Sequence, residues 1–225
     1  MALFLDFDGT LVDIAASPDA VTLPRKLSER LERLSGRLGG ALALVTGRSI
    51  DNLQDFLGPL AVHLAGSHGG DVRAPDDTAL RNGKPLPTPV PEALNRFAIA
   101  NGLLYERKAH GAALHYRARP ELKSVACDFA AELANAHGLT TKAGKCVIEL
   151  VWPGADKGGA VDLLAARAPF AGALPVFIGD DVTDEDGFAA CVRLGGFGIA
   201  VGERVSATAR YRLATVKDVY TWLEL

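Results

Sequence analysis

The stretch that decides the fold is Ala2-Leu3-Phe4-Leu5, followed directly by Asp6-Phe7-Asp8-Gly9-Thr10. A continuous apolar run predicts a strand that is buried on both faces, as in the centre of a parallel sheet. An unpaired carboxylate is too costly to bury in a core, so Asp6 and Asp8 are expected to face an opening. In open α/β sheets this opening lies beyond the carboxyl ends of the strands. For this segment alone, the alternative is an ordinary turn with an Asp at a strand end.

Further apolar runs repeat this pattern in both halves of the chain. Strands are predicted at 41–45, 61–65, 176–178 and 197–201, and helices over Leu27–Leu38 and from about Lys157, Thr183 and Val216 onward. Strands that alternate with helices indicate a parallel sheet with right-handed crossovers. The predicted fold class is therefore α/β, with a Rossmann-like parallel-sheet core built from residues 1–79 and 152–225.

The segment 80–151 has a different pattern. Residues 112–118 and 145–151 alternate between apolar and polar side chains, which is typical of strands with one covered face and one open face. Between them, a helical stripe is predicted from Leu122, Val125, Ala126, Phe129 and Leu133. This segment is therefore expected to form a small α+β module inserted into the α/β core.

Composition limits the classes of function. The 225 residues carry a net charge of −3, so no broad electropositive surface and no nucleic-acid partner are expected. No apolar stretch approaches the roughly 18 residues of a membrane span. The first strand begins almost at the first residue, so no signal peptide is expected. Three cysteines without metal-ligand spacing indicate free thiols in a reducing compartment, and the expected location is cytoplasmic.

Four short motifs end or follow the predicted core strands. They are Asp6–Thr10, Thr46-Gly47-Arg48, Asp156-Lys157-Gly158 and Gly179–Glu185. Each has a structural alternative. Thr46-Gly47 fits a turn into a helix, and Lys157 fits a solvated position in a first helical turn. The acids of the fourth motif fit a helix N-terminus, with Thr183 and Asp186 as a capping pair.

The number of carboxylates favours a catalytic interpretation. If the strand ends converge, Asp6, Asp8, Asp180, Asp181 and Asp184 share one crevice, and their repulsion would raise several of their pKa values. Mg²⁺ relieves such repulsion, because it binds one or two carboxylates and accepts phosphate oxygens. Lys157 can hold phosphate as a point charge, and Thr46 supplies a hydroxyl. These are the groups that phosphoryl transfer requires.

The order and spacing of the four motifs resemble the haloacid dehalogenase (HAD) superfamily of phosphohydrolases. The resemblance implies a HAD-like core with an inserted cap domain, placed here at 80–151. It implies that Asp6 is the nucleophile that becomes an aspartyl-phosphate, and that Asp8 is the general acid and base. Thr46 and Lys157 would bind phosphoryl oxygens. Asp180, Asp6 and the Asp8 backbone carbonyl would hold Mg²⁺, with Asp184 and Asp181 in supporting positions.

Within this superfamily the chain resembles the trehalose-phosphatase family. The similar segments are Leu11–Ile14, Ser17–Val21, Ala65–Gly69, Ala113–Arg117, Gly144–Glu149 and Gly179–Glu185. The resemblance implies hydrolysis of trehalose 6-phosphate to trehalose and phosphate. The chain is expected to act as a monomer. The resemblance also implies that cap residues bind sugar hydroxyls, and that Arg48 contacts the substrate. The expected cap ligands are Glu106, Lys108, Arg117, Lys145 and Glu149.

Two other functions remain open at this point. One is a phosphatase of the same superfamily for another sugar phosphate, such as sucrose phosphate, which only the cap residues would distinguish. The other is a signalling receiver domain, which also places acids, a Thr and a Lys around Mg²⁺. A receiver domain does not need Asp8 as an acid and base, nor an insertion as long as 80–151.

Overall fold

The computed structural model describes residues 1–14, 21–108, 110–144 and 146–225. The chain divides into two compact units, Met1–Asn82 with Asp156–Leu225, and Gly83–Ala155. Arg81 belongs to the larger unit, because its guanidinium group donates to the carbonyl oxygens of Gly69 at 2.8 Å and Gly159 at 3.2 Å. The chain therefore leaves the larger unit slightly later than the predicted boundary at residue 79.

An eight-stranded sheet forms the larger unit, in the order β12-β11-β10-β1-β2-β3-β4-β5. The strands are β1 (Ala2–Leu5), β2 (Leu42–Val45), β3 (His63–Gly66), β4 (Asp71–Arg73), β5 (Ala79–Arg81), β10 (Pro175–Gly179), β11 (Phe197–Val201) and β12 (Tyr211–Leu213). The five predicted apolar runs form neighbouring parallel strands, β11-β10-β1-β2-β3, so the predicted α/β parallel core is confirmed. The apolar runs do not predict β4, β5 and β12, which are only three residues long.

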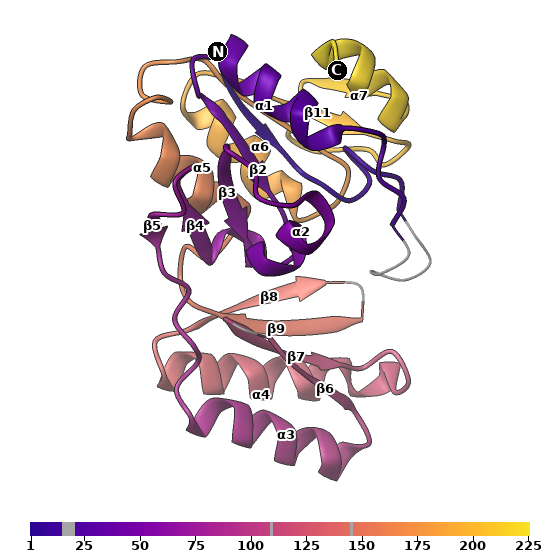
Figure 1. The fold of residues 1–225 in the computed structure, drawn as a ribbon. Coiled ribbons are helices and arrows are strands. Elements are labelled where there is room, and N and C mark those ends of the chain that lie inside the picture. The colour runs from indigo at the N-terminus through magenta and orange to yellow at the C-terminus, as the bar shows by residue number, and fades with distance from the viewer. Residues whose placement is uncertain (15–20, 109, 145) are drawn as a thin grey trace. The chain divides into compact units, whose positions relative to one another are not determined.

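Helices cover both faces of this sheet (Figure 1). They are α1 (Leu27–Arg37), α2 (Ile50–Leu57), α5 (Lys157–Ala165), α6 (Asp184–Arg193) and α7 (Val216–Leu223), together with the short 3₁₀ helix η2 (Ser67–Gly69). Alternate residues of β1 enter the two cores: Leu3 and Leu5 pack with α1, α2 and α7, whereas Ala2 and Phe4 pack with α5 and α6. Each large apolar side chain buried in this way contributes about 1.5–3 kcal/mol. This two-sided burial explains the unbroken apolar run before Asp6.

The smaller unit is an antiparallel sheet in the order β6-β7-β9-β8, with two helices along one face (Figure 1). Its elements are α3 (Pro89–Asn101), β6 (Leu104–Arg107), β7 (Gly111–His115), η3 (Pro120–Leu122), α4 (Lys123–Ala136), β8 (Thr140–Gly144) and β9 (Val147–Val151). The helices pack together through stacked rings of Phe97 and Phe129, whose centroids lie 4.1 Å apart. The predicted α+β character of this segment is therefore observed.

Two details of the smaller unit differ from the sequence prediction. The stripe of α4 that faces the sheet consists of Ala126, Ala130 and Ala134, whereas Val125 is 49% exposed. Small alanines allow the helix to lie close to the sheet, so the buried stripe lies one position away from the larger side chains. Helix α3 was not among the predicted helices, and its Pro89 and Pro91 lie in the first turn, where a missing N–H is tolerated.

The structure also bears on membrane insertion. Among the residues that it describes, every helix is too short or too polar to cross a lipid bilayer.

The different burial of the three cysteines predicts their reactivity. Cys191 on α6 is fully buried, and burial raises the pKa of its thiol to about 12. At pH 8 its thiolate fraction is then on the order of 10⁻⁴, so iodoacetamide should modify Cys127 and Cys146 but not Cys191 in the native protein. Peptide mass spectrometry measures this, and a guanidinium-unfolded sample, labelled at all three, is the control. Rapid native labelling of Cys191 would contradict the packing.

Candidate active site

A cavity of about 380 Å³ lies in the larger unit, where the carboxyl ends of β1, β2 and β10 meet the start of α5. All four motifs contribute to its lining, together with Ile14 and His68. The motif residues are Asp6, Asp8, Thr46, Gly47, Lys157, Asp180, Asp181 and Thr183. Parallel neighbours end at the same edge of a sheet, so motifs that are far apart in the sequence lie together here. The structure thus brings the predicted core-site residues into one place.

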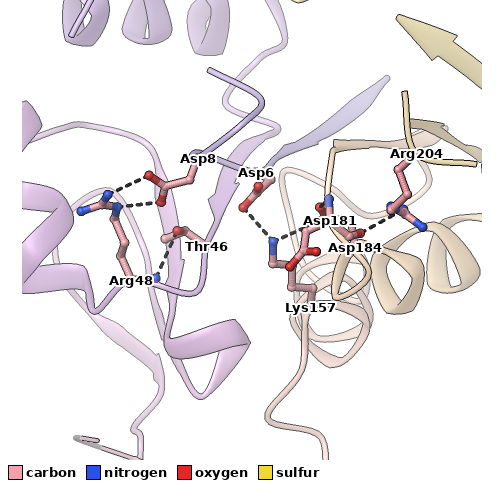
Figure 2. A network of polar contacts seen from close by, with 8 residues as sticks. All are labelled: Asp6, Asp8, Thr46, Arg48, Lys157, Asp181, Asp184 and Arg204. Carbon is pink, nitrogen blue, oxygen red and sulfur yellow. Dashed lines mark hydrogen bonds and ion pairs between the residues drawn. The ribbon is translucent and has the colours of Figure 1, made fainter. Parts of the chain in front are cut away.

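Lys157 joins two carboxylates at the base of this cavity (Figure 2). Its Nζ atom donates to Asp6 Oδ1 at 2.7 Å and to Asp184 Oδ1 at 2.6 Å. The side chains of Lys157, Asp6 and Asp184 are only 3%, 6% and 0% exposed. Burial raises the pKa values of both carboxyl groups, and the ammonium group opposes that shift. Burial would lower the pKa of Lys157, but its two partners raise it above the ordinary value.

Three carboxylates form a group suited to a metal ion. Asp6, Asp180 and Asp184 each offer an oxygen atom, and these atoms lie within 4.8 Å of one another. Burial, with repulsion from Asp184 and Asp181, raises the pKa of Asp180 to about 6. An all-oxygen donor set with excess negative charge fits a hard cation such as Mg²⁺ better than Zn²⁺, which favours nitrogen and sulfur.

Gly9 allows Asp180 to approach the loop after β1. Its φ angle is +75°, and a Cβ atom at this position would lie 2.2 Å from Asp180 Oδ2. A larger residue would therefore be strained by its backbone and would also displace the Asp180 carboxylate.

Asp8 and Thr46 are both contacted by Arg48 (Figure 2). The Arg48 guanidinium group donates through Nε to Asp8 Oδ2 and through Nη2 to Asp8 Oδ1, both at 2.7 Å. The Arg48 backbone N–H donates to Thr46 Oγ1 at 3.2 Å. Arg48 was predicted as a substrate ligand, and here its side chain is engaged by a carboxylate of the chain itself.

The acids of the fourth motif have different environments. Asp184 is fully buried, and its Oδ2 atom accepts from the Asp181 backbone N–H at 2.8 Å. Asp181 itself is exposed, and neither its carboxylate nor that of Asp8 belongs to the three-carboxylate group among the described residues. The alternative interpretation of these acids included a capping pair of Thr183 and Asp186, but the Thr183 side chain makes no capping bond at the start of α6. A capping role therefore does not account for Asp184.

Sequence analysis missed Arg204, which lies beyond β11. Its Nε atom donates to the Asp180 carbonyl oxygen and its Nη2 atom to that of Asp181, each at 3.0 Å. Its Nη1 atom also donates to Glu185 Oε1 at 2.7 Å. Arg204 thus ties the loop after β10 to the start of α6. Figure 2 shows Arg204 beside Asp181. No spacing in the sequence links it to these partners.

His68 is a second residue whose place in the site was not predicted. It lines the cavity, and its ring lies so close to Gly47 that a Cβ atom there would be 2.7 Å from His68 Cε1. The sequence signal was the segment Ala65–Gly69, which contains His68 and was used only for the family resemblance. Gly47 is therefore also needed to accommodate a side chain from the loop after β3.

The smaller unit presents the predicted sugar ligands on its own sheet. Glu106 on β6 and Glu149 on β9 both pair in register with Ala113 on β7, so their side chains share one face. Lys108 forms an ion pair with Glu149, and His115 Nε2 lies 2.8 Å from Glu106 Oε2. Arg117 is exposed after β7. Lys145, and the segment 17–20, lie outside the described residues.

Comparison with known proteins identifies the family. The family model for trehalose-phosphatase matches residues 4–217. The chain belongs to the trehalose-phosphatase family. As a member of this family it is a phosphoric monoester hydrolase, which confirms the family predicted from the sequence.

Individual proteins agree with this assignment. The trehalose-6-phosphate phosphatase of Escherichia coli (strain K12) is 37% identical, over 100% of this chain and 85% of the relative. A solved structure of the Aspergillus fumigatus trehalose-6-phosphate phosphatase has a TM-score of 0.76 and 25% identity, over 99% of this chain and 91% of that chain. A haloacid dehalogenase-like hydrolase from Bacteroides thetaiotaomicron has a TM-score of 0.73 at 17% identity, over 99% and 98% of the two chains, and shares the fold.

The buried position of Lys157 in this trehalose-phosphatase family member predicts a pH-dependent loss of stability in Lys157→Met. Removing one partner of a buried ion pair costs about 3–5 kcal/mol, because the remaining charge is uncompensated. Without the ammonium group, the pKa values of Asp6 and Asp184 rise further, so these carboxyl groups bind protons more readily in the folded protein. The deficit in unfolding free energy should therefore be full at pH 8 and smaller at pH 5.

Urea unfolding in EDTA measures this deficit at each pH. Arg193→Met is the matched control, because its ion pair with Asp162 is about half exposed, with side chains 58% and 47% accessible. This control should lose at most about 1 kcal/mol. Equal losses of unfolding free energy in the two variants would contradict the buried ion pairing of Lys157 with Asp6 and Asp184. A deficit for Lys157→Met that grows toward pH 5 would contradict it as well.

Proposed function

We propose that this enzyme hydrolyses trehalose 6-phosphate to trehalose and inorganic phosphate through a phosphorylated Asp6. The proposal is supported by the family match over residues 4–217, together with the convergence of the four motifs on one cavity. Asp6 follows the central strand, faces this cavity, and is held by Lys157 at 2.7 Å. A carboxylate fixed in this way is oriented for attack on phosphorus.

In the first half-reaction, an Asp6 oxygen attacks phosphorus while the bond from phosphorus to the sugar oxygen breaks. Asp8 gives a proton to that oxygen, so trehalose leaves and an aspartyl-phosphate remains. In the second half-reaction, Asp8 takes a proton from a water molecule whose oxygen attacks phosphorus. The bond to Asp6 then breaks, and inorganic phosphate leaves with both active-site carboxyl groups restored.

Thr46 and Lys157 are the proposed ligands of the phosphoryl oxygens. Both residues line the cavity, Thr46 with a buried hydroxyl group and Lys157 with an ammonium group. A hydroxyl donor and a positive charge on fixed elements stabilise the charge on the transferring group without further rearrangement.

The proposed ligands of Mg²⁺ are Asp6, Asp180 and Asp184, with Asp181 and the Asp8 backbone as neighbouring candidates. When bound, Mg²⁺ would supply positive charge that offsets the negative charge of the phosphoryl oxygens. Burial, together with repulsion from Asp184 and Asp181, raises the pKa of Asp180, and this unfavourable crowding of carboxylates supports such a partner.

The proposed sugar ligands are on the smaller unit. They are Glu106, Lys108, Arg117, Lys145 and Glu149. A sheet face that carries paired carboxylates and cations suits a ligand rich in hydroxyl groups better than an apolar one. Sucrose phosphate is the alternative substrate, and the match to the trehalose-phosphatase family favours trehalose 6-phosphate.

Substitution of the nucleophile should abolish turnover. Asp6→Asn keeps the shape of the side chain but cannot form the aspartyl-phosphate, so kcat with trehalose 6-phosphate should fall by several orders of magnitude. Phosphate release measures the rate, and circular dichroism checks the fold. Asp51→Asn, at an exposed carboxylate on α2, is the control and should keep wild-type activity. Near wild-type turnover by Asp6→Asn would refute the assignment.

The choice of substrate is tested with a panel of sugar phosphates. With Mg²⁺ present, kcat/KM for trehalose 6-phosphate should exceed that for sucrose phosphate and glucose 6-phosphate by at least about 10²-fold, because a site built to hydrogen-bond particular sugar hydroxyls rejects substrates that leave those ligands unpaired. EDTA should remove the activity, and added Mg²⁺ should restore it. A preference for sucrose phosphate would instead support the alternative, and full activity in EDTA would exclude the proposed metal.

A further inference from the structure

We propose that Arg48 is a positioning residue that fixes the Asp8 carboxylate for proton transfer, rather than a ligand of the phosphoryl group. This inference rests on the proposed function, in which Asp8 is the general acid and base. The evidence is the set of contacts of the Arg48 side chain, which are made to other residues of the protein and favour a positioning role over substrate binding.

The first observation is the bidentate geometry of the pair. Nε and Nη2 of Arg48 each donate to a different oxygen atom of Asp8 at 2.7 Å. Two parallel hydrogen bonds fix the plane of the carboxylate as well as its distance, which a single contact does not. Lysine cannot reproduce this arrangement, because its ammonium group is a point charge without a planar fork.

The second observation is that the guanidinium group is itself held in place. Its Nη1 atom donates to Asn52 Oδ1 on α2 at 2.9 Å. Its carbon atom lies 5.6 Å from the centre of the Phe7 ring and 4.8 Å from that of Phe56. Cation–π contacts and an amide partner therefore restrain the group on the sides that do not contact Asp8.

The third observation is the difference in exposure between the two partners. Asp8 is 37% exposed and lines the cavity, whereas the Arg48 side chain is only 9% exposed. Among the described residues, Arg48 is not part of the cavity lining. Figure 2 shows its guanidinium group on the side of Asp8 that is remote from Asp6 and Lys157. Arg48 thus supports Asp8 from outside the cavity.

The bidentate contact between Arg48 and Asp8 is compatible with proton transfer by Asp8. A carboxylate oxygen has two lone pairs, so one hydrogen bond from Arg48 to each oxygen leaves a second direction available. Because Asp8 lines the cavity, that direction can serve the sugar oxygen and later the water molecule. The fixed plane then determines where the proton is delivered.

The decisive experiment is a double-mutant cycle with trehalose 6-phosphate. Arg48→Ala should lower kcat by about 10²-fold, the order of cost of a misplaced catalytic group, with little change in KM. Asp8→Asn removes the proton transfer itself. If Arg48 acts through Asp8, Arg48→Ala combined with Asp8→Asn should have the same kcat/KM as Asp8→Asn alone. If the double variant instead loses kcat/KM by the product of the two single-variant losses, and KM is raised in Arg48→Ala, the proposal is overturned and Arg48 is a substrate ligand.

A second readout uses the leaving group. p-Nitrophenyl phosphate has a leaving group that departs without protonation, so Arg48→Ala should lose much less activity with it than with trehalose 6-phosphate. Millimolar guanidinium ion should partly restore sugar-phosphate turnover by occupying the vacated position. Equal losses with both substrates, with no restoration, would contradict a role through Asp8.

Two further variants separate positioning from folding. Arg48→Lys keeps the positive charge but not the planar guanidinium group that binds both oxygens of Asp8. Its kcat should therefore fall, as in Arg48→Ala. Arg73→Ala removes another partly buried arginine that pairs with carboxylates, Asp71 and Asp77, and should leave kcat and KM unchanged. If the wild-type protein hydrolyses no sugar phosphate, the proposed function fails and the role of Arg48 fails with it. If the wild-type protein is active but the cycle is additive, only the role of Arg48 fails.

Discussion

The buried ammonium group of Lys157 is the interaction on which the rest of the site depends. It joins the end of β1, through Asp6, to the start of α6, through Asp184, and it comes from the first residue of α5. Two carboxylates could not remain almost fully buried without this charge, because desolvation would neutralise or expel them. The Asp156 side chain accepts from the Gly159 backbone N–H at 2.6 Å, which fixes the helix start that carries Lys157.

The sheet order makes this interaction possible. β1 lies between β10 and β2 in parallel register, so the segments that follow these three strands emerge at the same edge. The strands on the two sides of β1 are separated in the sequence by the whole smaller unit. Even so, Lys157 Nζ lies 2.7 Å from Asp6 Oδ1. A topological switch point beside the central strand is the position where open α/β sheets bind ligands. The fold therefore dictates where a site can form before any catalytic residue is chosen.

The sequence predicts this framework well, because its signals are local. Buried strands appear as apolar runs, and acids placed directly after such runs must meet at one edge. The contacts of Arg48 and Arg204 were not predictable in the same way. Asp8 is 40 positions from Arg48, and the carbonyl oxygens bound by Arg204 belong to a loop that no periodicity describes. In the smaller unit, Val125 was misassigned because a stripe of alanines, rather than the larger side chains, packs closely against the sheet.

The two arginines position different kinds of group. Arg48 fixes a side chain, Asp8, whereas Arg204 fixes the backbone carbonyl groups of Asp180 and Asp181. Five aspartates were expected to share this crevice, namely Asp6, Asp8, Asp180, Asp181 and Asp184. Among the described residues, Lys157 and Arg48 are the cations paired with members of this group, whereas Arg204 already pairs with Glu185. Five carboxylates against two cations leave an excess of three negative charges, which a phosphate group would increase further. One divalent cation reduces this excess to a single charge, so the metal and the phosphate are best accommodated together.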